Sequence, residues 1–332
     1  MLRSETAGDP ARTERALAGL SAYQQAPRRK PPRPLLPVAE IRGSALRSYA
    51  RPGARGQVVL FVPSLINPPD IFDLDRERSL LRWLAGGELR PLLLDWGPAE
   101  LRRHLSVAGH VETILLPLIA ALDEPPVLVG YCLGGTMAAA AAQLAAVRGL
   151  ATIAAPWHFS GFPDGSRAAL AALWAQAAPA AQAMGRLPME VLQAAFWQLD
   201  PARTIGKYEA FAGFDPDSPE AAAFVTLEDW TNQGEPIPLP AARELFEDMF
   251  AADLPGKGAW QVGGQIIDPA GITAPMLHFV SASDRIVPAA SAFESGDRVM
   301  LAPGHVGMVI GSSARRQLWE PLARWLANPA PG

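Results

Sequence analysis

The stretch between residues 126 and 147 constrains the fold more than any other part of the chain. Residues 126–130 form an apolar run as long as a buried strand, and they lead directly into Tyr131-Cys132-Leu133-Gly134-Gly135 and an alanine-rich stretch at 137–147. A strand, a glycine turn and a helix in this order predict that Cys132 stands on a sharp strand-to-helix turn. The flanking glycines support this prediction, since side chains there would collide with the neighbouring strand or helix.

Strand and helix patterns alternate on both sides of this turn. Short apolar runs of strand length occupy 57–62, 91–95, 149–154, 276–281 and 298–301, and helix-like stretches occupy 76–85, 111–122 and 313–326. Apolar strands separated by helices are typical of a mostly parallel, doubly wound sheet covered by helices on both faces. We therefore expect an α/β protein.

The alternation stops between residues 156 and 255, where helix-rich segments carry several tryptophans. We expect this segment to be a helical cap inserted into a core made of residues 38–155 and 256–332. Residues 1–37 are rich in alanine, arginine and proline and include the basic cluster Arg28-Arg29-Lys30 with Arg33. Such a composition favours a flexible, extended N-terminal arm.

An acid and a base follow the cysteine in chain order. Asp284 lies just past the apolar run at 276–281, and His305 lies in a glycine-containing loop before the last helix pattern. Nucleophile, acid and histidine in this order, after a G-x-nucleophile-x-G turn, are typical of the α/β-hydrolase fold. We predict Cys132, Asp284 and His305 as a catalytic triad, in which the position of Cys132 at a helix N-terminus favours the thiolate.

An oxyanion hole would need two backbone N–H groups near the sulfur. The position of Leu133 directly after the nucleophile predicts the first donor, and Leu65, in the loop after the run at 57–62, is the candidate for the second. Ile66, Asn67 and Tyr131, with His158 and Trp230 from the predicted cap, are the candidate pocket residues.

Composition excludes several classes of protein. A net charge of −4 with 19% charged residues offers no basis for nucleic-acid binding, and no apolar run approaches the length of a membrane span. A single cysteine excludes an intramolecular disulfide and a multi-cysteine metal site. No metal cluster, phosphate loop or dinucleotide fingerprint is found in the sequence, so we expect no metal and no bound cofactor. We expect a cytoplasmic protein, because residues 1–29 contain no secretory signal.

Four stretches resemble the polyhydroxyalkanoate synthases, which polymerise 3-hydroxyacyl-CoA into a storage polyester. The block at 62–69 continuing to 80 resembles the family's first signature, and 94–97 is similar to its short, two-subunit class. Residues 130–136 look like the family's cysteine lipase box. The stretch 230–240, with Asp284 and Gly304-His305, is similar to its cap exit and acid–base loops.

The resemblance covers about residues 40–326. It implies that a CoA thioester acylates Cys132, that His305 activates the thiol, and that Asp284 orients His305 or helps to deprotonate the incoming hydroxyl. CoA would be part of the substrate, the product would be a polyester, and the protein could work at a polyester granule surface. The similarity to the short class implies a companion subunit or a homodimer as partner.

Two other functions remain open on the sequence. On the same scaffold, a thioesterase or polyester depolymerase would use water as the acceptor, and water exclusion depends on how the cap closes. A non-catalytic granule-associated paralogue would keep the fold alone. The presence of Cys132, Asp284 and His305 together argues against that third reading.

Overall fold

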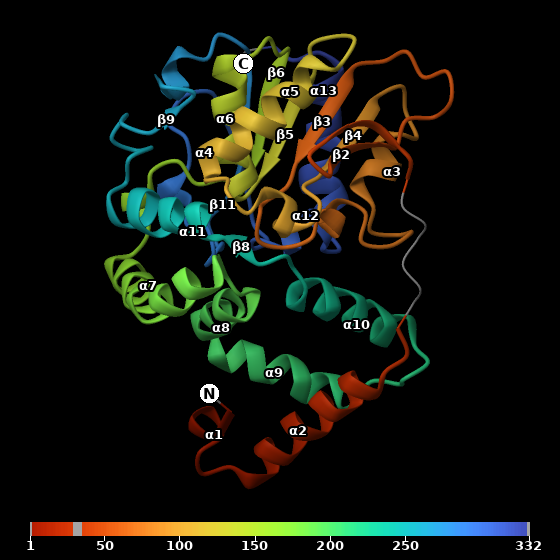
Figure 1. Cartoon of the computed structure of the whole chain (residues 1–332). Coiled ribbons are helices and arrows are strands. Elements are labelled where there is room, and N and C mark those ends of the chain that lie inside the picture. Colours follow the sequence, from red (N-terminus) through yellow and green to blue (C-terminus); the bar gives the residue numbers. More distant parts are fainter. Residues whose placement is uncertain (1, 29–34, 331–332) are drawn as a thin grey trace. The chain divides into compact units, whose positions relative to one another are not determined.

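The structure is a computed structural model that describes residues 2–28 and 35–330 (Figure 1). The chain separates into two compact units. The sheet unit comprises residues 35–188 and 235–332, and the helical unit comprises residues 1–34 and 189–234. The part of the predicted arm that contains Arg29, Lys30 and the prolines at 31–34 lies outside the described residues.

The sheet unit is built on one eight-stranded sheet with the order β1-β2-β4-β3-β5-β6-β11-β12. Strands β4, β3, β5, β6, β11 and β12 run parallel, whereas β2 is antiparallel to β4 and β1 is antiparallel to β2. The predicted mostly parallel sheet is thereby confirmed. The strands are β1 (Pro37–Ile41), β2 (Ser44–Ser48), β3 (Val58–Val62), β4 (Arg90–Asp95), β5 (Val127–Tyr131), β6 (Gly149–Ile153), β11 (Met276–Ser281) and β12 (Asp297–Leu301).

The central strands are mostly apolar because both faces of the sheet are covered. Every residue of β3, β5, β6 and β11 is buried. A parallel sheet covered on both faces has this uniform pattern, whereas a half-exposed sheet alternates apolar and polar residues. Strands β1 and β2 were not predicted as strands, and the residues of β1 are exposed or half-buried.

Helices between the strands cover the sheet. Helix α6 contacts β3, β5 and β6, and its small alanine and glycine side chains let its backbone approach the strands closely. The helices of the sheet unit that flank these strands are α3 (Leu80–Leu84), α4 (Val107–His110), the π-helical segment η3 (Val111–Leu115), α5 (Leu116–Ala120), α6 (Leu133–Leu144), α12 (Gly307–Ile310), the π-helical segment η8 (Arg315–Trp319) and α13 (Glu320–Ala327).

One predicted helix is shorter than expected. The expectation was a helix over 76–85, but α3 begins at Leu80. The side chain of Asp75 accepts hydrogen bonds from the N–H groups of Glu77 and Arg78, which closes a turn there. Ser79 then caps the helix by accepting from the N–H of Arg82 at 3.1 Å. Local side-chain bonds of this kind compete with helical backbone bonds.

The segment predicted as a cap, 156–255, is mostly helical, but it divides between the two units. Residues 189–234 belong to the helical unit, and the remainder belongs to the sheet unit. The elements of this segment that belong to the sheet unit are η4 (Phe159–Gly161), α7 (Asp164–Met184), β7 (Arg186–Leu187), β8 (Ile237–Pro238), α11 (Leu239–Arg243) and the π-helical segment η5 (Glu244–Ala251), with β7 paired to β8. After the segment, β9 (Gln261–Val262) pairs with β10 (Gln265–Ile266).

The helical unit differs from the expectation of an extended N-terminal arm. Residues 2–25 form the helices α1 (Leu2–Glu5) and α2 (Pro10–Gln25), which join α8 (Met189–Leu199), α9 (Pro201–Phe211) and α10 (Pro219–Asn232). Asp9 caps α2 by accepting from the N–H of Arg12 at 2.9 Å, and Pro10 occupies the first turn, where its missing N–H costs nothing.

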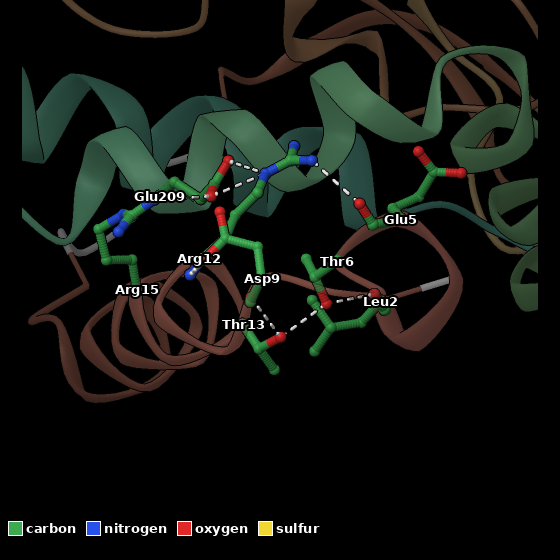
Figure 2. Close-up of polar contacts among 8 residues, drawn as sticks. All are labelled: Leu2, Glu5, Thr6, Asp9, Arg12, Thr13, Arg15 and Glu209. Carbon is green, nitrogen blue, oxygen red and sulfur yellow. Dashed lines mark hydrogen bonds and ion pairs between the residues drawn. The ribbon is translucent and has the colours of Figure 1, made fainter.

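Helix α2 is packed along α9 and is not a free tether. The guanidinium of Arg12 donates to both carboxylate oxygens of Glu209 at 3.0 and 3.1 Å, and Thr13 donates to the hydroxyl of Thr6 at 2.7 Å (Figure 2). A Cβ on Gly19 would lie 1.8 Å from the backbone oxygen of Tyr208, so the two helices touch at this glycine. A buried cluster of Tyr23, Phe211, Ala221 and Val225 completes the unit.

Candidate active site

Three loops that leave the sheet at one edge carry the residues predicted as the triad. Cys132 directly follows β5, Asp284 follows β11, and His305 follows β12. These strands are parallel to one another and lie within the run β5-β6-β11-β12. The carboxyl ends of parallel strands meet at the same edge of a sheet, which is where open α/β sheets place their ligand sites.

Cys132 occupies a strained backbone position between β5 and α6. Its φ is 54° and its ψ is −132°, and it stands at the N-cap of α6. Its N–H donates to the carbonyl of Ile153 on β6 at 3.0 Å, and its carbonyl accepts from the N–H of Gly135 at 2.9 Å. A positive φ is unfavourable for a residue with a side chain, and such strain is concentrated at functional sites. The side chain is partly exposed.

The neighbouring glycines are required by contact. A Cβ on Gly130 would lie 2.4 Å from the Cα of Gly135, and one on Gly134 would lie 2.2 Å from the carbonyl oxygen of Val62. A Cβ on Gly135 would lie 2.2 Å from the Cβ of Ala155. These distances agree with the collision argument made from the sequence for the flanking glycines. They also show that α6 begins directly against the end of β3.

Asp284 and His305 form a buried pair. Nδ1 of His305 lies 2.7 Å from Oδ2 of Asp284, and the two side chains are 8% and 0% exposed. The other carboxylate oxygen, Oδ1, accepts from the N–H groups of Ile286 at 2.8 Å and Val287 at 3.0 Å. Both oxygens of Asp284 are therefore engaged, and Nδ1 is the imidazole nitrogen that contacts the carboxylate, which leaves Nε2 for a different partner.

The charges around His305 favour its protonated form. Burial by itself lowers the pKa of His305, but the Asp284 carboxylate and the Cys132 sulfur act in the opposite direction and raise this pKa to about 10. The Cys132 sulfur acts on this pKa through both its charge and a hydrogen bond. The acid and the imidazole are in direct contact, and the role of the three residues as a catalytic triad stays a prediction.

Tyr131 forms a wall against the histidine. Its ring lies 4.9 Å from the His305 ring, centroid to centroid, and its hydroxyl donates to the carbonyl oxygen of His305 at 3.3 Å. Burial raises the pKa of Tyr131, and the charges of Cys132 and Asp284 raise it further. The neutral phenol is 3% exposed, so it packs against the base.

The loop after β3 lies at the start of α6, as the oxyanion prediction requires. A Cβ on Gly134 would lie 2.6 Å from the carbonyl oxygen of Pro63, two residues before Leu65. The N–H of Leu133 belongs to the first turn of α6, where N–H groups have no acceptor within the helix. Leu65 is buried, while Ile66 and Asn67 are half-buried in the same loop. The roles of these residues as oxyanion donors and pocket walls stay predictions.

A buried network behind this loop was missed by the sequence reasoning. Nε1 of Trp96 donates to the carbonyl oxygen of Pro63 at 3.0 Å, and the ring of His110 lies edge-on to the indole at 5.6 Å. Nη1 of Arg102 lies 3.1 Å from Nε2 of His110. Burial lowers the pKa of His110 to about 3, so this imidazole stays neutral. The sequence signal that could have indicated this network is a tryptophan, Trp96, directly after the end of a strand.

Two candidate pocket residues are not brought into this set. The N–H of His158 donates to the carbonyl of Ser291 at 3.0 Å, and its Nε2 lies 3.9 Å from Oε1 of Glu294. The observed partners of His158 are thus Ser291 and Glu294, in the segment that follows β11, and not the thiol of Cys132. Trp230 lies on α10 of the helical unit. Their assignment as pocket residues stays a prediction.

Neither a membrane span nor a metal cluster occurs in the part of the chain that the structure describes. No helix within 2–28 or 35–330 is both long and apolar enough to cross a bilayer. Within the same ranges, no three histidine, cysteine or carboxylate side chains are grouped as metal ligands.

Sequence comparison finds relatives that are named for the same activity. The chain is 25% identical over 295 residues to the poly(3-hydroxyalkanoate) polymerase subunit PhaC of Haloarcula marismortui, 82% of this chain being covered. It is 26% identical over 293 residues to the subunit of the same name in Haloferax mediterranei. The chain spans only 61% and 58% of these two proteins. The subunit PhaC of Allochromatium vinosum is 27% identical over 300 residues, with 84% of this chain and 83% of that protein covered.

Comparison of structures identifies the fold. The monoacylglycerol lipase of Paleococcus ferrophilus superposes with a TM-score of 0.53 at 16% identity, covering 86% of this chain and 99% of that one. A thermophilic esterase from Thermogutta terrifontis superposes with a TM-score of 0.50 at 16% identity, covering 85% and 92%. No family model matches the sequence. The chain therefore has the α/β-hydrolase fold and is related in sequence to the poly(3-hydroxyalkanoate) polymerases, which confirms the resemblance drawn from its motifs.

Proposed function

We propose that this chain is an acyltransferase of the poly(3-hydroxyalkanoate) polymerase type, with Cys132 as its nucleophile. The observation that carries the proposal is the strained Cys132 at the start of α6 beside the buried His305–Asp284 pair. The names of the sequence relatives supply the product class, a poly(3-hydroxyalkanoate) polyester. The resemblance to the polyhydroxyalkanoate synthases supplies the substrate class, a 3-hydroxyacyl-CoA thioester.

The first half-reaction is acylation of the thiol. His305 accepts the proton of Cys132 through Nε2, and the thiolate attacks the thioester carbonyl. The negative charge that develops on the carbonyl oxygen is stabilised by the N–H groups of Leu133 and Leu65. When the tetrahedral intermediate collapses, the bond to the sulfur of CoA breaks, and CoA leaves with the proton from His305. Cys132 then carries the acyl group as a thioester.

The second half-reaction extends the chain. The hydroxyl group of a second hydroxyacyl unit attacks the Cys132 thioester while His305, oriented by Asp284, removes the hydroxyl proton. An ester bond forms, the bond to the Cys132 sulfur breaks, and the thiol is regenerated with the proton from His305. The acyl chain is longer by one unit, and no oxidant or metal is needed to balance either half-reaction.

A cysteine suits this chemistry better than a serine. Transfer between two thiols exchanges one thioester for another and is nearly isoenergetic, so the acyl group stays activated for the next transfer. A serine ester would lose that activation. This difference explains why a lipase-like turn would carry a thiol in an enzyme that builds esters.

Two further points belong to the proposal. A companion subunit or a second copy of the chain would be the partner, as the similarity to the subunit PhaC of Allochromatium vinosum suggests. A polyester product would place the active protein at the surface of a polymer granule. No bound cofactor takes part, because CoA enters and leaves as part of the substrate.

The test is to incubate the purified protein with 3-hydroxybutyryl-CoA, with and without a candidate companion subunit, and to follow free CoA together with insoluble polyester. Wild type, Cys132→Ala and Cys132→Ser should be compared. We expect wild type to release CoA and form polymer, and Cys132→Ala to do neither. Cys132→Ser should lose most of the polymerisation.

Other outcomes would change the assignment. Release of CoA with only free hydroxyacid would show a thioesterase. Release of CoA that persists in Cys132→Ala would show that the cysteine is not the nucleophile. If wild type releases no CoA from either short-chain or medium-chain substrates, the proposed substrate class would be contradicted.

A further inference from the structure

A cavity of about 520 Å³ lies within the sheet unit. Its walls come from residues 76–83, at the end of the loop that follows β3, and from residues 310–319, after α12. This volume falls within the range of about 300–1,000 Å³ that is typical of small-molecule sites. None of its lining residues belongs to the proposed triad or oxyanion hole.

Four arginines line the cavity: Arg76, Arg78, Arg82 and Arg315. Two of these charges are compensated, since Arg82 donates to both oxygens of Asp73 at 2.7 and 2.8 Å and Arg78 pairs with Asp75.

The other two guanidinium groups are available to a ligand. Arg315 lies 3.7 Å from Glu320, but both side chains are well exposed, so this pair is weak. In the described part of the chain, Arg76 has neither a hydrogen bond nor an ion pair. Glu77 is an acidic side chain in the lining. Arg76 and Arg315 together therefore form an anion-binding rim.

An aromatic surface lies next to this rim. The Trp83 ring packs on the Trp319 ring with 5.8 Å between centroids, and the guanidinium of Arg315 lies over Trp83 at 5.6 Å. Indole and guanidinium planes are the surfaces on which nucleobases stack. A cavity with arginines and a tryptophan thus has the chemistry to hold a base and its phosphates together.

The cavity is joined to the candidate active site by two short elements. Helix α12 starts two residues after His305, and its last residue, Ile310, which lines the cavity, is about 4.5 Å further along the helix axis at 1.5 Å per residue. The loop that supplies Leu65 continues to residues 76–79, and its turn η1 (Pro69–Phe72) contacts α12. The elements that hold the base and the predicted oxyanion donor therefore also build the cavity.

We infer that this cavity binds the phosphorylated adenosine end of the acyl-CoA substrate, with Arg76 and Arg315 on its phosphates and the adenine beside Trp83. The inference rests on the proposed function, because that function supplies the CoA thioester. Binding remote from the reacting carbon helps to position a substrate for transfer.

The direct test is a binding measurement that needs no catalysis. Adenosine 3′,5′-bisphosphate, dephospho-CoA and ATP are titrated into the Cys132→Ala protein by calorimetry. We expect the bisphosphate to bind, and the double variant R76A/R315A to bind it about tenfold more weakly, because two charge-assisted contacts are lost. The control R55A/R316A removes two exposed arginines outside the cavity and should bind as the parent does.

The kinetic test separates this inference from the proposed function. In R76A/R315A, KM for 3-hydroxybutyryl-CoA should rise about tenfold while KM for the matching pantetheine thioester, which lacks the nucleotide, stays unchanged. An equal change for both substrates, or no bisphosphate binding, would overturn the inference while Cys132-dependent turnover persists. Tighter binding of ATP than of the bisphosphate would assign the cavity to a free nucleotide. Arginine-dependent bisphosphate binding without Cys132-dependent CoA release would support the cavity and refute the proposed function.

Discussion

Replacing Asp284 by asparagine tests the electrostatic arrangement of the site with almost no change of shape. An asparagine can keep the two hydrogen bonds that Oδ1 accepts from the N–H groups of Ile286 and Val287. It would then turn its NH₂ group toward Nδ1 of His305, 2.7 Å away in the wild type. An NH₂ group needs an acceptor, so the imidazole would carry its proton on Nε2 and could no longer accept the proton of Cys132.

The size of the effect follows from the pKa of His305. At about 10, this pKa keeps the imidazole almost fully protonated at pH 7.5. Without the carboxylate, one of the two groups that raise this pKa is lost while the lowering by burial stays, so a smaller share of the imidazole is protonated at pH 7.5. Loss of the correct tautomer adds to this loss, and in serine triads the same substitution costs about 10⁴-fold in rate.

The assay is alkylation of Cys132 by iodoacetamide between pH 5 and 10, followed by mass spectrometry, alongside CoA release. The single cysteine of the chain makes the alkylation signal specific. We expect D284N to be alkylated at least about tenfold more slowly at pH 7 and to gain reactivity only at alkaline pH. D253N is the control, because the buried Asp253 accepts from the N–H groups of residues 159, 160 and 256 and not from His305. A wild-type alkylation profile in D284N would refute the reasoning.

Three further predictions concern packing and pH. G134A should lose about 1–3 kcal/mol of unfolding free energy and a larger share of CoA release, because its Cβ would lie 2.2 Å from the carbonyl oxygen of Val62. Denaturant titration measures the loss of stability. The control is G165A, where a Cβ meets nothing within 4 Å. The raised pKa of His305 adds stability that is fully present below about pH 6.5 and is lost as pH rises through about 10. The free energy of unfolding, measured with urea between pH 6 and 10, should therefore fall less steeply with pH in H305Q than in wild type. An equal pH dependence in the two proteins would disprove this contribution of His305. G19A should detach α2 from α9 and increase proteolysis of residues 10–25, because its Cβ would lie 1.8 Å from the oxygen of Tyr208; equal proteolysis of G19A and G206A would contradict this.

The sheet and the order of the candidate triad could be predicted because their signals are local. Strands β3, β5, β6 and β11 are buried on both faces, so their residues read as mostly apolar runs, interrupted inside the strands only by Thr152 and His278. The glycines around Cys132 act within one turn and leave a mark in the sequence. The outer strands β1 and β2 have mixed polar and apolar residues and carry no such signal.

The N-terminal helices show why composition misled the prediction. The alanines, arginines and prolines of residues 1–37 are typical of a tether, but Asp9 and Pro10 are a helix start signal. What stabilises α2 is its contact with residues almost 200 positions later, such as the pair between Arg12 and Glu209. A non-local contact of this kind cannot be read from a segment by itself, and the same is true of the bond from Trp96 to Pro63.

The strain at Cys132 and the placement of the oxyanion loop have a common origin. A non-glycine residue in a sparsely populated backbone region costs about 1–3 kcal/mol and persists only where its surroundings hold it. Here the surroundings are close backbone contacts, since Gly134 lies against the carbonyls of Val62 and Pro63. The absence of a side chain at Gly134 therefore lets α6 start beneath the nucleophile and lets the loop with Leu65 lie beside it. A larger residue at Gly134 would disturb the thiol and the predicted oxyanion donor together, so its effect on turnover should exceed its effect on stability.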